Sequence, residues 1–177
     1  MIMCLLSTAS CMGRTQKVDN STVASFDVER YLGNWYEIAR FDHSFERGMN
    51  STVATYTMKK DGGVGVINTG IRKGRTKTSV GKAKLTDTCG LLRVSFFGPF
   101  YSDYRVMMLI DDYKYALVGS GSADYLWIMS RYPVIPVNVK YLILSEAERR
   151  GYDISKLIWM DQSETVAPNG MAQNNAM

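Results

Sequence analysis

Short apolar or aromatic runs alternate with turn signals along most of this chain. The turn signals are groups of glycine and aspartate, such as Asp61-Gly62-Gly63 and Asp111-Asp112. Even spacing of this kind is typical of consecutive antiparallel hairpins. Eight runs are predicted to form strands, and they cover residues 35–41, 52–59, 63–71, 76–85, 91–97, 104–110, 115–119 and 125–131. Eight strands in an up-and-down meander can close into a barrel with room for one small ligand, and closure leaves no sheet edge unpaired.

The pattern changes after the eighth run. Pro133 and Pro136 interrupt the strands, apolar residues then recur at helical spacing, and Gly151 stands where a glycine ends a helix. We therefore expect one amphipathic helix over about residues 137–150, packed on the outside of the barrel, and a short ninth strand within 156–160. The predicted fold is an all-β, eight-stranded antiparallel β-barrel with one C-terminal α-helix, forming a single domain over residues 28–162.

The N-terminus has an apolar start that leads through small residues to Cys11. This order is typical of a lipoprotein signal, in which the chain is cut before a cysteine that then carries lipid. It predicts a signal remnant at 1–10, lipidation of Cys11 and a tether at 11–27. The alternative is an apolar N-terminus without any signal role. The Asn-rich, polar residues 163–177 are predicted to be disordered.

Composition narrows the possible chemistry. The chain has 177 residues, with 21 basic and 17 acidic side chains, and this mild excess forms no basic stripe for nucleic acid. A single histidine, His43, argues against a His-based metal site or a Ser–His catalytic pair. Cys89 lies in a predicted turn, and no disulfide is expected once Cys11 carries lipid. We therefore expect no metal, no cofactor and no nucleic-acid partner.

Three motifs placed on this pattern resemble the signatures of the lipocalin family. Gly33-Asn34-Trp35 is similar to the Gly-x-Trp motif on the first strand, Ile110-Asp111 holds the place of the second motif, and Ser130-Arg131 ends the eighth strand as the third motif does. The resemblance implies structural roles for Gly33, Trp35, Asp111 and Arg131. Trp35 is expected to close the base of the barrel beneath the Arg131 guanidinium, in a cation–π contact. Gly33 is expected to let the chain enter the base closely.

Segments 41–48, 94–101 and 124–128 resemble more narrowly the bacterial lipocalins, a subgroup of outer-membrane lipoproteins related to apolipoprotein D. The resemblance implies binding, storage or transport of a lipid or other small hydrophobic ligand, such as a fatty acid or lysophospholipid. It places the protein at the bacterial outer membrane, anchored by its lipid, in envelope maintenance. It also suggests a homodimer. Two alternatives stay open: an enzyme that acts through Glu37 and a lumen tyrosine, or a scaffold with an occluded barrel.

Alternation of side chains along a strand predicts which residues face the lumen. With Trp35 and Arg131 taken as inward, Glu37, Ala39 and Phe41 are also predicted to point inward, and the resemblance sets the register of the other strands. The residues predicted to bind ligand are Ala54, Tyr56, Val66, Asn68, Phe96, Arg105, Met107, Tyr125 and Trp127.

Arg105 is the most specific of these predictions. A guanidinium in an apolar cup needs an anionic partner, so Arg105 is expected to bind a carboxylate or phosphate head, to pair with Glu37, or to lie at the rim in solvent. Trp127 either lines the ligand tail or is an ordinary core tryptophan. The aromatic residues of 41–48 and 96–101 either meet a membrane or second subunit, or pack over the mouth.

Overall fold

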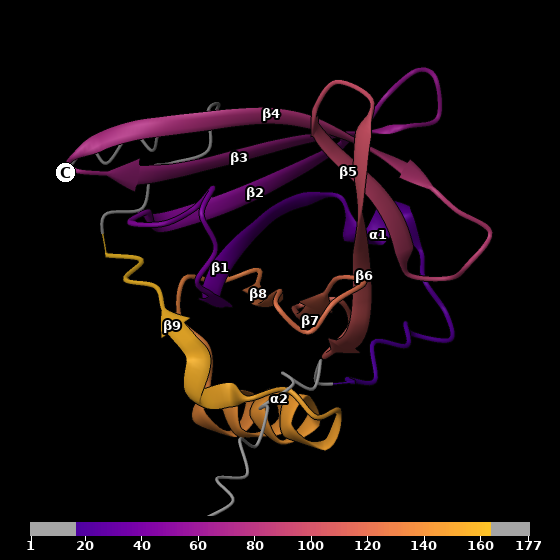
Figure 1. Ribbon diagram of the computed structural model, residues 1–177. Coiled ribbons are helices and arrows are strands. Elements are labelled where there is room, and N and C mark those ends of the chain that lie inside the picture. Colours follow the sequence, from indigo (N-terminus) through magenta and orange to yellow (C-terminus); the bar gives the residue numbers. More distant parts are fainter. Residues whose placement is uncertain (1–16, 164–177) are drawn as a thin grey trace, which may run out of the picture.

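A computed structural model describes residues 17–163, so Cys11, the predicted signal remnant and nearly all of the predicted tail lie outside the described part of the chain. Its centre is a closed antiparallel barrel with one long helix outside (Figure 1). The elements are α1 (Val28–Tyr31), β1 (Gly33–Phe41), β2 (Asn50–Met58), β3 (Val64–Arg72), β4 (Arg75–Leu85), β5 (Leu91–Phe97), β6 (Phe100–Ile110), β7 (Tyr115–Gly119), β8 (Leu126–Ser130), α2 (Val137–Arg149), the 3-10 helix η1 (Ile154–Lys156) and β9 (Leu157–Trp159).

The barrel closes through β1, which pairs with β2 on one side and with β8 on the other. The short β9 pairs with Ala39–Phe41 and so extends the sheet beside β1. The predicted eight-stranded barrel, outer helix and ninth strand are confirmed. Because all pairings are antiparallel, the connections 42–49, 73–74, 98–99 and 120–125 lie at one end, which we call the mouth. The other end, which carries α1, is the base.

The base is closed by the residues of the expected motifs. Trp35 is fully buried, and the Arg131 guanidinium lies 4.0 Å from the centre of its ring. Arg131 also donates hydrogen bonds to the carbonyls of Arg30 and Asn34, each at 2.8 Å. Gly33 has a φ of +90°, and a Cβ there would lie 3.4 Å from Arg131 Nη1. One arginine thus joins α1, the start of β1 and the end of β8.

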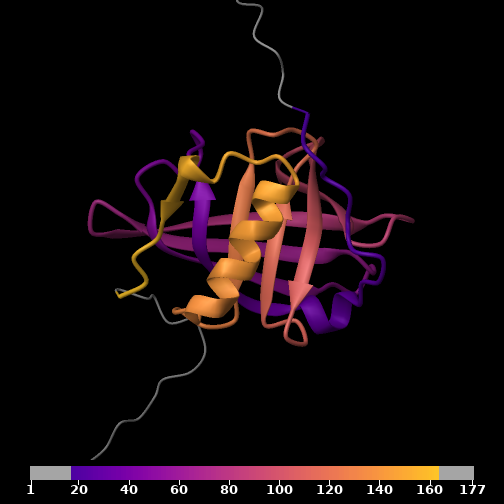
Figure 2. The same cartoon turned by 90° about the horizontal axis from the view of Figure 1, so that it is seen from below.

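The helix α2 packs on the outer wall of the barrel, and Figure 2 shows it lying across the strands. Its buried face consists of Val139, Ile143 and Ala147, at the spacing that the sequence predicted. These residues share an outer apolar cluster with Leu117 and Ile128.

The described part of the predicted tether, residues 17–27, lies on the barrel wall. The Asp19 amide donates to the Arg150 carbonyl at 2.9 Å, and the Val23 amide donates to the Val106 carbonyl at 3.0 Å. The Arg150 guanidinium in turn donates to the Ser21 carbonyl at 2.8 Å. This docking was not predicted, because its hydrogen bonds join residues about 80 to 130 positions apart.

The predicted inward positions are wrong on two strands. On β1, the register shifts between Glu37 and Ala39, so Trp35 and Glu37 face inward as predicted. Beyond this irregularity Ala39 and Phe41 belong to the outer cluster. An extra residue in a strand reverses the alternation beyond it, which explains the error.

On β6, the residue that shares the lumen cluster is Val106, whereas Met107 belongs to the outer cluster with the residues of α2. The prediction for Arg105 and Met107 was therefore one residue out of phase. A second register shift, between Val106 and Met108, restores Leu109 to the lumen side.

Candidate ligand-binding site

The lumen is lined mainly by apolar side chains. Of the residues predicted to bind ligand, Ala54, Tyr56 and Val66 are buried in the lumen cluster, and Phe96 and Trp127 pack against it. The small side chains of the same cluster are the alanines Ala54, Ala83 and Ala116, which lie on β2, β4 and β7. An apolar interior with a few placed polar groups is the usual form of a site for small hydrophobic ligands.

Asn68 is one of these polar groups. It follows Val66 by two residues on β3 and so shares its face of the sheet. Its Oδ1 is buried and has no hydrogen-bond partner among the described residues. A ligand hydroxyl or amide would satisfy this acceptor, since a buried unpaired polar atom is costly.

Phe96 packs against the neighbouring strand β4 at the position of Gly81. A Cβ at Gly81 would be 2.7 Å from Phe96 Cδ1 and 2.8 Å from the Ser95 carbonyl oxygen. Both distances are shorter than any ordinary contact, so any larger side chain at 81 would displace the Phe96 ring. The absence of a side chain at Gly81 therefore gives the Phe96 ring its place against β4.

Three tyrosines form the floor of the lumen above Trp35. The hydroxyl of Tyr104 lies 2.8 Å from that of Tyr31 and accepts from that of Tyr56 at 2.9 Å. Burial raises the pKa of Tyr31 and of Tyr104 well above the ordinary value, and burial likewise raises the pKa of Tyr56. The three hydroxyls therefore stay neutral. Only Tyr56 was predicted, because Tyr104 has the opposite parity to the predicted Arg105 and Tyr31 precedes the first strand.

Charged residues are buried at the mouth end of the lumen. Arg40 is 1% exposed and Glu37 is 2% exposed, and Arg40 Nη1 donates to Glu37 Oε1 at 2.5 Å. Arg40 Nη2 donates to the carbonyl of Glu46 at 2.7 Å and to that of Met49 at 3.3 Å. Arg40 thus holds the loop 42–49 onto the barrel.

Burial raises the pKa of Glu37 to about 8, with the neighbouring carboxylate of Glu46 adding to the effect and Arg40 opposing it. Glu37 therefore keeps its proton at neutral pH.

Aromatic rings cover the same loop. His43 stacks on Phe45 with ring centres 3.9 Å apart, and Tyr125 stacks on Trp127 at 5.9 Å. Trp127 Nε1 donates to Glu46 Oε2 at 3.4 Å, and His43 Nε2 lies 3.0 Å from the same oxygen. The predicted residues Tyr125 and Trp127 therefore lie where the loop 42–49 meets the lumen. Arg40 and Glu46 were not predicted as site residues, because nothing in the local sequence distinguishes them from surface charges.

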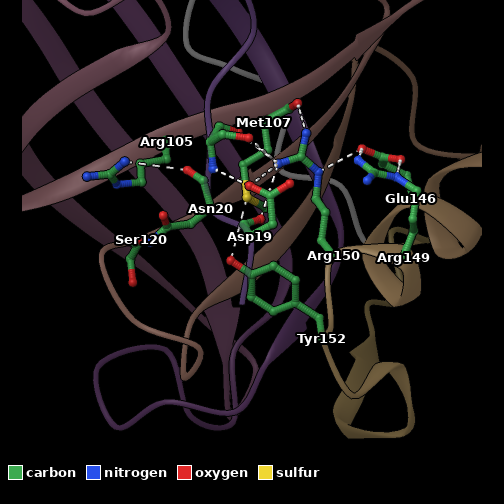
Figure 3. Close-up of polar contacts among 10 residues, drawn as sticks. Asp19, Asn20, Arg105, Met107, Ser120, Glu146, Arg149, Arg150 and Tyr152 are labelled. Atoms are coloured by element: carbon green, nitrogen blue, oxygen red, sulfur yellow. Dashed lines mark hydrogen bonds and ion pairs between the residues drawn. The ribbon is translucent and has the colours of Figure 1, made fainter. Parts of the chain in front are cut away.

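Arg105 and Met107 do not line the lumen. Arg105 Nη2 donates to Asp103 Oδ2 at 2.8 Å. Arg105 Nη1 donates to the carbonyl of Asn20 at 3.4 Å (Figure 3). Met107 lies beneath Arg150 and Tyr152, which bind its carbonyl and its sulfur. The expectation that Arg105 binds an anionic head inside the barrel, or pairs with Glu37, is therefore wrong.

Asp111, the residue of the second motif, lies in the β6–β7 turn with a φ of +49°.

The family follows from comparison with known proteins. The model of the lipocalin-like domain matches residues 26–162, which is most of the chain. This chain belongs to the lipocalin family. The lipocalin is 48% identical over 157 residues to the outer membrane lipoprotein Blc of Escherichia coli K12, which covers 86% of this chain and 89% of the relative. It is 33% identical over 150 residues to apolipoprotein D of Mus musculus, covering 78% of each chain.

A solved structure gives the same fold. Insecticyanin from the tobacco hornworm Manduca sexta superimposes on this lipocalin with a TM-score of 0.69 at 25% identity, covering 81% of this chain and 85% of that one. Among residues 17–163 of the lipocalin, no helix has the length and apolar character needed to cross a membrane.

Proposed function

We propose that this lipocalin binds the apolar chain of a fatty acid or lysophospholipid in its lumen, for storage or transport at the bacterial outer membrane. The observation that carries the proposal is the lumen itself: apolar walls on every strand, a neutral tyrosine floor and buried polar groups near the mouth. Burying each methylene of an acyl chain contributes about 0.8 kcal/mol. Glu37, the carboxylate that an enzyme would use, is already bound by Arg40, which favours a binding protein over an enzyme.

Calorimetric titration of the delipidated protein with a fatty acid and with a lysophospholipid tests the proposal. Val66 is 2% exposed on the lumen side of β3, whereas the adjacent Ile67 is 38% exposed on the outer side. We expect Val66→Phe to weaken binding by about tenfold or more, because the ring occupies space that the acyl chain needs. Ile67→Phe is the matched control and should bind as the wild type does. Equal affinities for the two variants, with both folded by circular dichroism, would show that the lumen is not the site.

We also propose that Cys11 carries the lipid that anchors the protein to the outer membrane. The relatives named outer membrane lipoproteins support this, together with the order of residues before Cys11. In a bacterial host, Cys11→Ala should abolish incorporation of radioactive palmitate and move the protein out of the membrane fraction. Cys4→Ala, which changes a cysteine in the segment to be removed, should retain both properties. Labelling of the Cys11→Ala protein would disprove the assignment.

A further inference from the structure

The docked N-terminal segment brings the anchor point close to the mouth of the barrel. The Lys17 carbonyl lies 3.6 Å from the position of a Cβ on Gly151, at the mouth end of α2, and Asn20 Nδ2 donates to the Ser120 carbonyl in the β7–β8 connection. Cys11 precedes Lys17 by six residues, a length of chain that spans at most about 20 Å. If Cys11 carries lipid, as proposed above, the mouth lies within that distance of the bilayer.

The mouth exposes phenylalanine. Phe97 and Phe100 flank the turn between β5 and β6, and each is 78% exposed. Phe45, in the loop 42–49, is 53% exposed. Large apolar side chains gathered at one end of a protein usually mark a surface that is covered by a partner or a membrane.

Basic side chains also lie at the mouth, on the hairpin that adjoins the loop of Phe45. The β3–β4 hairpin carries Arg72, Lys73, Arg75 and Lys77, all of which are exposed. None of the four forms a salt bridge with a carboxylate among residues 17–163. A Cβ on Gly48 would lie 3.9 Å from Arg72 Nε, so this hairpin adjoins the loop 42–49. Positive charge next to exposed aromatic residues suits the surface of a membrane that contains anionic lipids.

A second exposed apolar patch lies at the base. Val134 and Val137 are 76% and 84% exposed, but they lie at the opposite end of α2 from Gly151. That helix has 13 residues, so its length of about 20 Å separates this patch from the anchor point. The position of the tether therefore favours the mouth over the base.

We propose that the mouth of the barrel docks on an anionic lipid surface. The Phe97–Phe100 hairpin and Phe45 enter the interfacial layer, and the basic β3–β4 hairpin contacts the headgroups. The lumen then opens toward the bilayer, so that a lipid passes between membrane and barrel beneath the loop 42–49 without crossing water.

The experiment uses the full chain with Cys11→Ala, which removes the covalent anchor and tests the docking surface alone. Binding is measured by co-sedimentation with vesicles of phosphatidylcholine, with and without phosphatidylglycerol. We expect binding to the anionic vesicles that weakens as salt is added. Phe97→Ser with Phe100→Ser should reduce it by about tenfold or more. Lys73→Glu with Arg75→Glu should also reduce it and should diminish its salt dependence.

Val134→Ser with Val137→Ser is the matched control, because it removes two equally exposed apolar side chains from the base, and it should bind as Cys11→Ala alone does. Failure of the Cys11→Ala protein to bind anionic vesicles, or an equal loss in the control, would overturn the proposal. Sedimentation velocity tests whether a second copy of this chain covers the surface instead. If the Cys11→Ala protein is a dimer that does not bind vesicles, and Phe97→Ser with Phe100→Ser converts it to a monomer, the surface is a subunit interface.

Ligand binding in the lumen is a separate readout. Phe97→Ser with Phe100→Ser should leave the calorimetric affinity for a fatty acid unchanged, since neither residue belongs to the lumen cluster. Vesicle binding that persists in a protein without lumen affinity would support docking while disproving the proposed ligand function. A protein that binds a fatty acid in the lumen but does not bind the vesicles would disprove docking alone.

Discussion

Three buried or partly buried arginines of this lipocalin each bind backbone carbonyl groups outside their own helix or strand. Arg131 binds carbonyls of α1 and β1, Arg40 binds those of the loop 42–49, and Arg150 binds those of the N-terminal segment and β6. Only Arg131 was predicted, because it belongs to a short motif on a predicted strand. Arg40 and Arg150 resemble surface residues in the sequence. Their burial depends on acceptors supplied by segments that only the folded chain brings near.

Arg131→Met tests the structural role of the motif arginine. The variant keeps much of the apolar stem but leaves the carbonyls of Arg30 and Asn34 without their donor and removes the cation–π contact with Trp35. We expect the free energy of unfolding to fall by about 2–3 kcal/mol in urea denaturation. Arg149→Met is the control, because Arg149 is 61% exposed and pairs with Glu146. A similar loss in both variants would contradict the assigned role.

Glu37 should make the stability of the protein depend on pH. Its pKa is about 8 in the folded protein, against an ordinary value of 4.5. Between these values the folded state binds a proton that the unfolded state does not, so the free energy of unfolding falls as pH rises from about 5 to 8. The neighbouring Glu46 and His43 lie in the same cluster and stay in place in the Glu37→Gln variant.

Glu37→Gln removes the ionisable group and keeps an oxygen for Arg40 to bind. Urea denaturation across this pH range should therefore show a flatter dependence in the variant than in the wild type. Above pH 5 the carboxyl of Glu146, whose pKa the hydrogen bond from Arg149 lowers to about 2, stays ionised and contributes no slope. Parallel pH profiles for wild type and variant would refute the raised pKa of Glu37.

At the scale of the elements, the hydrophobic pattern predicted the barrel, the helix and the ninth strand, and it failed at irregular points. The register that the resemblance set gave the inward faces of β2 and β3 correctly, because Tyr56 and Val66 lie in the lumen cluster, and on β8 the predicted Trp127 packs against it. Alternation failed beyond the bulge in β1, and the register taken from the resemblance was out of phase on β6. A bulge depends on how two strands pair, and a single strand's pattern carries no record of it. The helix α1 was missed because only four residues form it, capped by Asp27.

The docked N-terminal segment gives a prediction at this scale. Arg150 is 8% exposed and donates to carbonyls of Asp19, Ser21 and Met107 (Figure 3). Arg150→Met should release the segment, and the Val23 amide, which bonds to the Val106 carbonyl, should then exchange with deuterium about tenfold faster or more. The amides of β7 in the barrel should keep their protection.

Arg149→Met serves again as the neighbour control, since Arg149 bonds to Glu146 and should leave exchange at Val23 unchanged. Unchanged exchange at Val23 in the Arg150→Met protein would show that the strand-like bond to Val106 holds the segment by itself. The N-terminal segment would then stay on the barrel wall without the hydrogen bonds from Arg150.

At the scale of the whole molecule, the two ends of the barrel differ in what closes them. The base is filled by Trp35 and the tyrosine floor, joined by ring contacts 4.7 Å apart between Tyr31 and Trp35. The mouth is covered by the loop 42–49, which is held by Arg40 and by Trp127 through polar contacts. A ligand bound as proposed would therefore enter by displacing this loop rather than by opening the core. The sequence predicted aromatic residues in this loop but left open whether they pack inward or face a partner, and Phe45 remains exposed while His43 is buried.

Occupancy of the lumen should raise the stability of the whole barrel. A ligand that binds the folded chain and not the unfolded chain adds about 2.7 kcal/mol at a concentration one hundred times its Kd. Thermal denaturation of the wild type should therefore shift upward with fatty-acid concentration and continue to rise logarithmically after the site is saturated. The Val66→Phe protein should show a much smaller shift at the same concentrations, whereas Ile67→Phe should match the wild type. A shift of equal size in all three proteins would place the stabilising ligand on the outer surface, because only Val66 among the two substituted positions faces the lumen.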